Sequence, residues 1–140
     1  MDMRRGPRAP GVFGTEEGVT YAVDWFAGGN AVGVYLLSHM HTDHTAGLFD
    51  GDSGRAKREW SRRAGSKIVC SAQTKALLVA SGVSTCRIEA LPLNQPCAVS
   101  VEGGRSGPCV TLIDANHCPG SVMFLIQWGN IHNLHTGDFR

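Results

Sequence analysis

The sequence lacks any apolar run of the roughly 20 residues that a membrane-spanning helix needs. Its first residues, MDMRRGPRAPGVFGTEEG, contain no apolar core of signal-peptide length. Cysteine is limited to five widely spaced residues without a Cys-x-x-Cys pair, which argues against a disulfide framework and against a zinc knuckle built from thiolates. These absences predict a reduced, intracellular protein that does not bind membranes.

Net charge is also nearly absent, because thirteen Lys and Arg residues stand against twelve Asp and Glu residues, for a formal charge of +1. Bulk charge therefore gives no sign of nucleic-acid binding. The basic residues gather in two runs, one before Pro10 and one between Arg55 and Lys67. Such runs are most often solvated loops, and contact with phosphate is the less favoured alternative.

The sequence does contain enough apolar side chain for one core, since 42% of its 140 residues are hydrophobic. Eighteen glycines favour short strands and tight turns over a helix bundle. The composition predicts a globular domain of the α/β or α+β class.

The chain begins with segments of different character. Residues 1–18 are rich in Gly, Pro and Arg and predict a disordered basic lead-in, so the domain is expected over 19–140. Two apolar runs, 19–26 and 31–37, flank turn residues and predict a β-hairpin. Residues 45–66 are polar, apart from the part near 56–60, and predict a surface loop or insertion.

The remaining residues alternate apolar runs with turns. A short strand over 67–70 is followed by an amphipathic helix over 73–80, which ends at Ser81-Gly82. Further strands are expected over 87–93, 98–102, 110–114, 121–128 and 131–136.

The motif His39-x-His41-x-Asp43-His44 places four candidate metal ligands at the end of an apolar run. Alternation in an extended chain directs His39 and His41 to one side, and Asp43 and His44 follow where a turn can present them to a second ion. A lone histidine is more often a satisfied core residue. Burial of the whole cluster without metal would leave polar atoms unpaired, so the cluster favours a metal site.

This motif resembles the signature of the metallo-β-lactamase superfamily. Three other segments resemble further motifs of that superfamily: Thr20-Tyr21-Ala22-Val23-Asp24, Ala115-Asn116-His117-Cys118-Pro119-Gly120-Ser121 and Thr136-Gly137-Asp138-Phe139-Arg140. The resemblance implies an αββα sandwich, of which this chain would hold the amino-terminal half, with a mostly mixed or antiparallel sheet and few helices.

The resemblance also implies roles for individual residues. His39, His41 and His117 would bind one metal ion, Asp43 and His44 a second ion, and Asp138 both. Asp24 would not touch metal but would orient a ligand through a hydrogen bond. The implied cofactor is Zn²⁺, as one or two ions, with Mg²⁺ or Mn²⁺ as alternatives at the second site. Asp43, His44 and Asp138 would form the catalytic group, whereas His135 is expected to be a strand residue.

The residues around these ligands resemble the DNA cross-link-repair nuclease family, the Artemis and Apollo group. The resemblance spans about residues 21–140 and implies 5′-to-3′ exonuclease activity on DNA with 5′-phosphorylated ends, with structure-specific endonuclease action possible. It further implies nuclear work in cross-link repair, break repair or telomere end processing. Asp114-Ala115-Asn116-His117 disfavours the Artemis branch.

The family continues through a β-CASP domain and the second half of the sandwich, neither of which is in this sequence. We therefore expect an amino-terminal fragment whose own activity is doubtful. The alternatives are an RNA-processing β-CASP endonuclease, a small-molecule hydrolase of the glyoxalase type, and an inactive truncated remnant.

Overall fold

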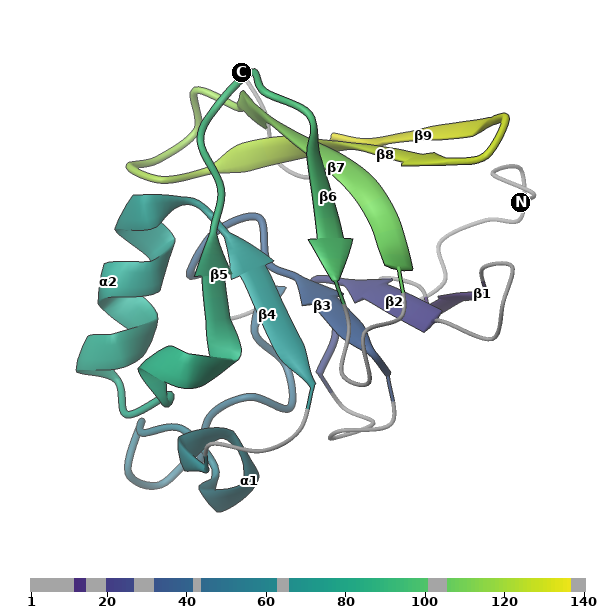
Figure 1. The fold of residues 1–140 in the computed structure, drawn as a ribbon. Coiled ribbons are helices and arrows are strands. Elements are labelled where there is room, and N and C mark those ends of the chain that lie inside the picture. Colours follow the sequence, from purple (N-terminus) through teal and green to yellow (C-terminus); the bar gives the residue numbers. More distant parts are fainter. Residues whose placement is uncertain are drawn as a thin grey trace.

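The computed structural model describes residues 12–14, 20–26, 32–41, 44–62, 66–100 and 106–136. Two β-sheets lie one over the other, and helices α1 and α2 lie on the outer side of the first sheet (Figure 1). The expected mixed α/β class, with mostly strands and few helices, agrees with this arrangement. No described helix has the length and apolar character that a membrane crossing requires.

The first sheet has the strand order β1-β2-β3-β4-β5. Its strands are β1 (Val12–Gly14), β2 (Thr20–Val23), β3 (Val34–Leu36), β4 (Lys67–Cys70) and β5 (Ile88–Ala90). The pairs from β2 to β5 are parallel, and β1 is antiparallel to β2. Strand β3 is buried along its whole length, as is typical of a parallel strand with both faces covered.

Two expectations for the beginning of the chain differ from the structure. The runs over 19–26 and 31–37 do not form a hairpin, because β2 and β3 pair in parallel, with Tyr21 opposite Val34. A parallel pair lets both strands end at the same edge of the sheet. Within the expected lead-in, Val12–Gly14 form β1, while residues 1–11 and 15–18 lie outside the described residues.

Helix α2 (Ala72–Ala80) confirms the helix predicted over 73–80. It begins after Ser71, whose hydroxyl accepts a hydrogen bond from the Thr74 backbone N–H at 3.2 Å, as an N-cap serine does. It ends at Ala80 with Ser81 as its C-cap, and Gly82 then adopts a φ of 99°, a left-handed conformation that favours glycine.

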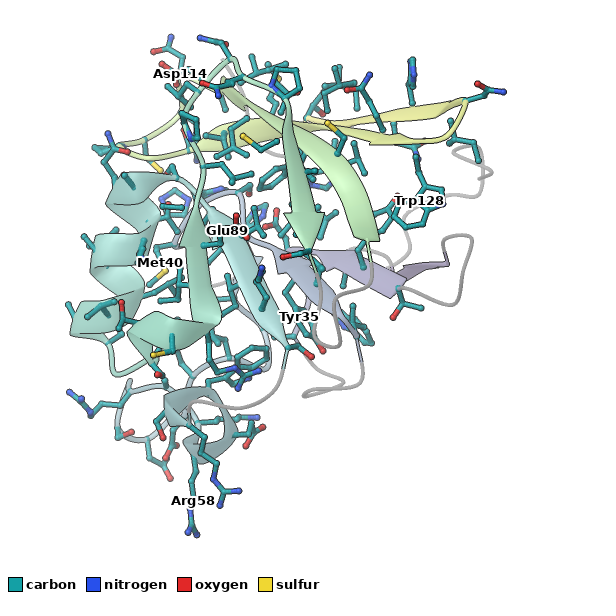
Figure 2. The ribbon with its side chains drawn as sticks, in the orientation of Figure 1. Tyr35, Met40, Arg58, Glu89, Asp114 and Trp128 are labelled. Atoms are coloured by element: carbon teal, nitrogen blue, oxygen red, sulfur yellow. The ribbon has the colours of Figure 1, made fainter. Side chains whose placement is uncertain are left out.

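The segment over 45–66 was predicted to be a surface loop or insertion, but the structure shows that it contributes to the core. It contains α1 (Arg58–Ser61), whose Trp60 is fully buried, edge-on to Phe26 and Tyr35. The Arg87 guanidinium lies 4.3 Å from the centre of the Trp60 ring. Arg58 points away from the body of the protein (Figure 2), as expected for a solvated basic run.

The second sheet is antiparallel, in the order β6-β7-β8-β9. Its strands are β6 (Cys97–Ser100), β7 (Ser106–Asp114), β8 (Val122–Trp128) and β9 (Ile131–His135). Strand β7 begins four residues before the predicted 110, because an irregular register opposite β6 accommodates Pro108. The predicted strand over 87–93 is shorter, since Arg87 belongs to a 3₁₀ helix (Thr85–Arg87) and β5 ends at Ala90.

Two apolar clusters hold the layers together. The first lies between the two sheets and includes Leu36, Val69, Leu112 and Phe124. The second lies between the first sheet and its helices and includes Trp60. Among the described residues the layers are therefore helix, sheet and sheet, with the loops that follow β3 and β7 at one edge of the interface.

Candidate metal centre

The loop after β3 carries the first two histidines. Ser38 and His39 are buried, whereas His41 is exposed. The ring centres of His39 and His41 are 4.4 Å apart, so both point to the same side, as alternation predicts. Met40, between them, packs toward the helical side of the first sheet (Figure 2).

The third histidine, His117, comes from the second sheet, in the loop between β7 and β8. The Ser121 hydroxyl accepts hydrogen bonds from the backbone N–H groups of His117 at 3.1 Å and Cys118 at 3.0 Å. Asn116 has a φ of 53° and Gly120 a φ of 84°, so the loop uses two left-handed residues to turn. This loop geometry fixes the backbone that carries His117.

Two contacts join the His117 loop to the rest of the site. The Val122 N–H donates to the Ser38 carbonyl at 3.0 Å, which ties the start of β8 to the residue before His39. The Gly120 carbonyl accepts from the Ser71 hydroxyl at 2.7 Å and from the Thr74 hydroxyl at 3.3 Å. The loop is thus attached both to the first sheet and to the beginning of α2.

His39, His41 and His117, here called the histidine trio, form a group that can hold a metal ion. One ring nitrogen from each lies within 4.8 Å of the others. Nε2 of His117 lies 3.2 Å from Nδ1 of His41. Two nitrogens bound to one tetrahedral zinc at about 2.0–2.1 Å would be separated by about 3.3 Å. The donor set and this spacing both fit Zn²⁺.

The charge state of His39 also suits a cation. Burial, followed by the neighbouring His44 and His41, lowers the pKa of His39, so its ring is neutral near pH 7. Only a neutral imidazole offers a lone pair to a metal.

Asp24 is a buried carboxylate that contacts Ser38 and two histidines of the site. Its Oδ1 accepts from the Ser38 backbone N–H, and its Oδ2 accepts from the Ser38 hydroxyl, each at 2.7 Å. Nδ1 of His44 lies 2.7 Å from Oδ2, and Nε2 of His135 makes a longer contact at 3.5 Å. Burial raises the pKa of Asp24, but its contacts with His135, His44 and Ser38 outweigh burial and lower the pKa to about 2.

His44 lies beside the trio, since its ring centre is 4.1 Å from that of His39. Its Nδ1 faces Oδ2 of Asp24, so this carboxylate holds the His44 ring beside the trio. Asp43 and Asp138 lie outside the described residues. Their assignment as ligands, and the catalytic roles of Asp43, His44 and Asp138, stay predictions.

Sequence reasoning missed three side chains at this site. Ser38 bonds to Asp24 and contacts His39, Ser121 holds the His117 loop, and His135 approaches Asp24. For Ser38 and Ser121 the only available signal was a hydroxyl flanking a histidine motif. His135 was predicted to be a strand residue, and it does lie on β9, but its proximity to Asp24 depends on how the two sheets meet.

Gly120 provides a test of how tightly the His117 loop is held. A Cβ at Gly120 would lie 2.9 Å from the Gln73 Cβ and 3.1 Å from the hydroxyl oxygens of Ser71 and Thr74. We expect Gly120→Ala to reduce the free energy of unfolding, measured in urea, by about 2–3 kcal/mol from strain and crowding.

Gly129→Ala is the matched control for this substitution. Gly129 also has a positive φ, 57°, but a Cβ there meets nothing within 4 Å. It should therefore lose only about 1 kcal/mol, from the left-handed backbone alone. Equal losses in the two variants would contradict the close packing of the loop against α2.

The chain is similar in sequence to proteins of known name. The chain is 42% identical over 126 residues to the 5′ exonuclease Apollo of Gallus gallus, an alignment that covers 88% of the chain. It is 41% identical over 133 residues to the Protein artemis of Rattus norvegicus, with 89% of the chain covered. The chain is a relative of Apollo and Artemis. The predicted resemblance to the Artemis and Apollo group is thereby confirmed.

The alignments cover only a small part of the relatives' own length. The chain spans 24% of the length of the Gallus gallus Apollo and 19% of the Rattus norvegicus artemis. Apollo of Danio rerio is 40% identical over 111 residues, covering 78% of the chain and 18% of that Apollo. No family model matches the chain. Identities of 42% and 41% do not separate an Apollo branch from an Artemis branch.

Proposed function

We propose that this chain carries the metal centre of a DNA nuclease that hydrolyses phosphodiester bonds during DNA repair. The observation that supports this function most directly is the histidine trio, contributed by both sheets. The second support is the 42% identity to a protein named 5′ exonuclease Apollo. The first observation supplies a cation site, and the second supplies the class of reaction.

The proposed cofactor is Zn²⁺, bound by the histidine trio. A second ion, either zinc or Mg²⁺ or Mn²⁺, would be held by His44 together with Asp43 and Asp138. Divalent ions in such sites lower the pKa of water to about 7 and neutralise charge on a phosphate. No side-chain nucleophile is then required.

The protein residues have separate tasks in this proposal. The three imidazoles would hold the cation together, two from the loop after β3 of the first sheet and one from the loop after β7 of the second. Asp24 contacts Nδ1 of His44 and so would fix the orientation of that ring. Ser121 and Gly120 keep the His117 loop in place, so the ligands are positioned before a cation binds.

By relationship to Apollo and Artemis, we propose 5′-to-3′ digestion of DNA with 5′-phosphorylated ends, in the nucleus. We also propose that the helix, sheet and sheet layers belong to a metallo-β-lactamase-type αββα sandwich, for which the two facing sheets and the helices outside the first sheet are the support.

The protein, purified as its gene encodes it, should be tested on DNA oligonucleotides labelled at the 3′ end. We expect progressive shortening from the 5′ end, faster with a 5′-phosphate than with a 5′-hydroxyl. Removal of metal by a chelator should abolish digestion, and added zinc should restore it. Digestion that is unaffected by metal removal would contradict the proposal, as would a preference for RNA or for thioesters.

A further inference from the structure

The hydroxyl of Ser38 lies between the Asp24 carboxylate and the His39 ring. Its Oγ is 2.7 Å from Oδ2 of Asp24 and 2.9 Å from Nδ1 of His39. All three residues are 1% exposed, so water does not compete for these contacts. One buried hydroxyl therefore bridges the carboxylate and a member of the histidine trio.

The direction of each hydrogen bond follows from the atoms involved. Oδ1 of Asp24 accepts from the Ser38 backbone N–H, and Oδ2 accepts from the Ser38 hydroxyl, so the single hydroxyl hydrogen of Ser38 points at Asp24. The Ser38 oxygen then has only lone pairs to offer Nδ1 of His39, which must carry the ring hydrogen. The lone pair of the neutral His39 ring is thereby placed on Nε2.

We propose that Ser38 is a positioning residue of the candidate metal centre, which relays the hydrogen bonding of Asp24 to His39 and fixes the orientation and tautomer of that ring. Asp24 acts on His44 directly and on His39 through Ser38. The Asp24 carboxylate thus determines which ring nitrogen of His44 and of His39 carries the hydrogen. This inference rests on the proposed metal centre, and it does not depend on the substrate.

The backbone of Ser38 allows the role of the hydroxyl to be isolated. Its N–H donates to Asp24 and its carbonyl accepts from the Val122 N–H, and neither bond involves the side chain. Ser38→Ala therefore keeps the links between the two loops and removes only the relay. Ser38→Thr retains a hydroxyl at the same position.

The first measurement is the tautomer of His39 in the metal-free chain at a pH where the ring is neutral. Two-bond ¹H–¹⁵N correlation spectra distinguish a hydrogen on Nδ1 from one on Nε2. We expect the Nδ1–H form in the wild type and a mixture in Ser38→Ala. A wild-type His39 with its hydrogen on Nε2 would overturn the proposal, whatever the variants do.

The second measurement is zinc affinity, by competition with a chromophoric chelator. We expect Ser38→Ala to weaken binding by roughly 10- to 100-fold, the range found for partners that orient metal ligands, and Ser38→Thr to recover most of that loss. The control is Ser66→Ala, because the Ser66 hydroxyl is also buried and bonds to the Val32 carbonyl, at the opposite end of β4. It should bind zinc like the wild type.

Equal zinc affinity in Ser38→Ala and the wild type would overturn the proposal, and so would a loss shared by Ser66→Ala. If the wild type binds no zinc, both the metal centre and the role of Ser38 are rejected. If it binds zinc with the expected tautomer but leaves DNA intact, the nuclease proposal fails and the role of Ser38 stands.

Discussion

Replacement of His117 by alanine should lower the zinc affinity of the chain by at least about 100-fold. Loss of a residue that only orients a metal ligand costs up to about 100-fold, and His117→Ala removes a direct ligand. His117 is the member of the trio that comes from the second sheet, and its Nε2 lies 3.2 Å from Nδ1 of His41. Without it, two members of the trio remain, His39 and His41, both in the loop after β3. The same chelator competition measures the effect.

The proposed nuclease should lose activity with this ligand, so His117→Ala is expected to abolish DNA digestion. Zinc should also raise the melting temperature of the wild type, since binding to the folded state alone adds about 4 kcal/mol at a zinc concentration 1,000 times the Kd. The variant should lose most of this stabilisation while its metal-free melting temperature stays close to that of the wild type.

His132→Ala is the control, because His132 is an exposed histidine on β9. It should keep the zinc affinity and the activity of the wild type. Unchanged zinc binding in His117→Ala would refute the histidine trio, and an equal loss in His132→Ala would show that the effect is not specific to the site.

Loss of the Asp24 carboxylate should have the largest effect on stability. Asp24→Ala leaves the Ser38 N–H, the Ser38 hydroxyl and Nδ1 of His44 without their acceptor in a buried setting. We expect the free energy of unfolding in urea at pH 7 to fall by about 3–5 kcal/mol, as when one partner of a buried polar pair is removed. Asp52→Ala, at an exposed carboxylate, should change it little.

The pH dependence of the wild type provides an independent check. The pKa of Asp24 falls from 3.8 to about 2 on folding, so the folded state favours the ionised carboxylate. Its contribution is fully present above about pH 4 and is lost as the pH falls toward 2. A shift of this size corresponds to about 2 kcal/mol.

The difference between wild type and Asp24→Ala should therefore shrink in urea titrations taken from pH 5 to pH 2. A difference that stays constant over this range would contradict an ionised, hydrogen-bonded Asp24.

The sequence predicts best those elements whose signal is local. The strand over 67–70 and the helix over 73–80 match β4 and α2 closely, because apolar spacing and a Ser81-Gly82 stop define them without reference to other parts of the chain. The histidine motif is equally local, since alternation alone directs His39 and His41 to one side.

Features that depend on spatial neighbours could not be predicted in this way. Glycines after residue 26 are compatible with a tight turn or a crossover, so they do not determine that β2 and β3 run parallel. Trp60 lies in a polar segment and becomes a core residue only because Phe26 and Tyr35 face it. The Ser38 contact with Asp24 joins residues 14 positions apart.

The division of the trio between two sheets has a consequence for assembly. His41 and His117 are 76 residues apart in the chain, and they meet only after β6–β9 have docked on β2–β5. A slip of one residue between β7 and β8 would turn each side chain of the slipped strand to the opposite face and displace the His117 loop. Cation uptake during refolding would thus report correct alignment of the two layers, and a chain whose layers are misaligned would fail to capture the ion.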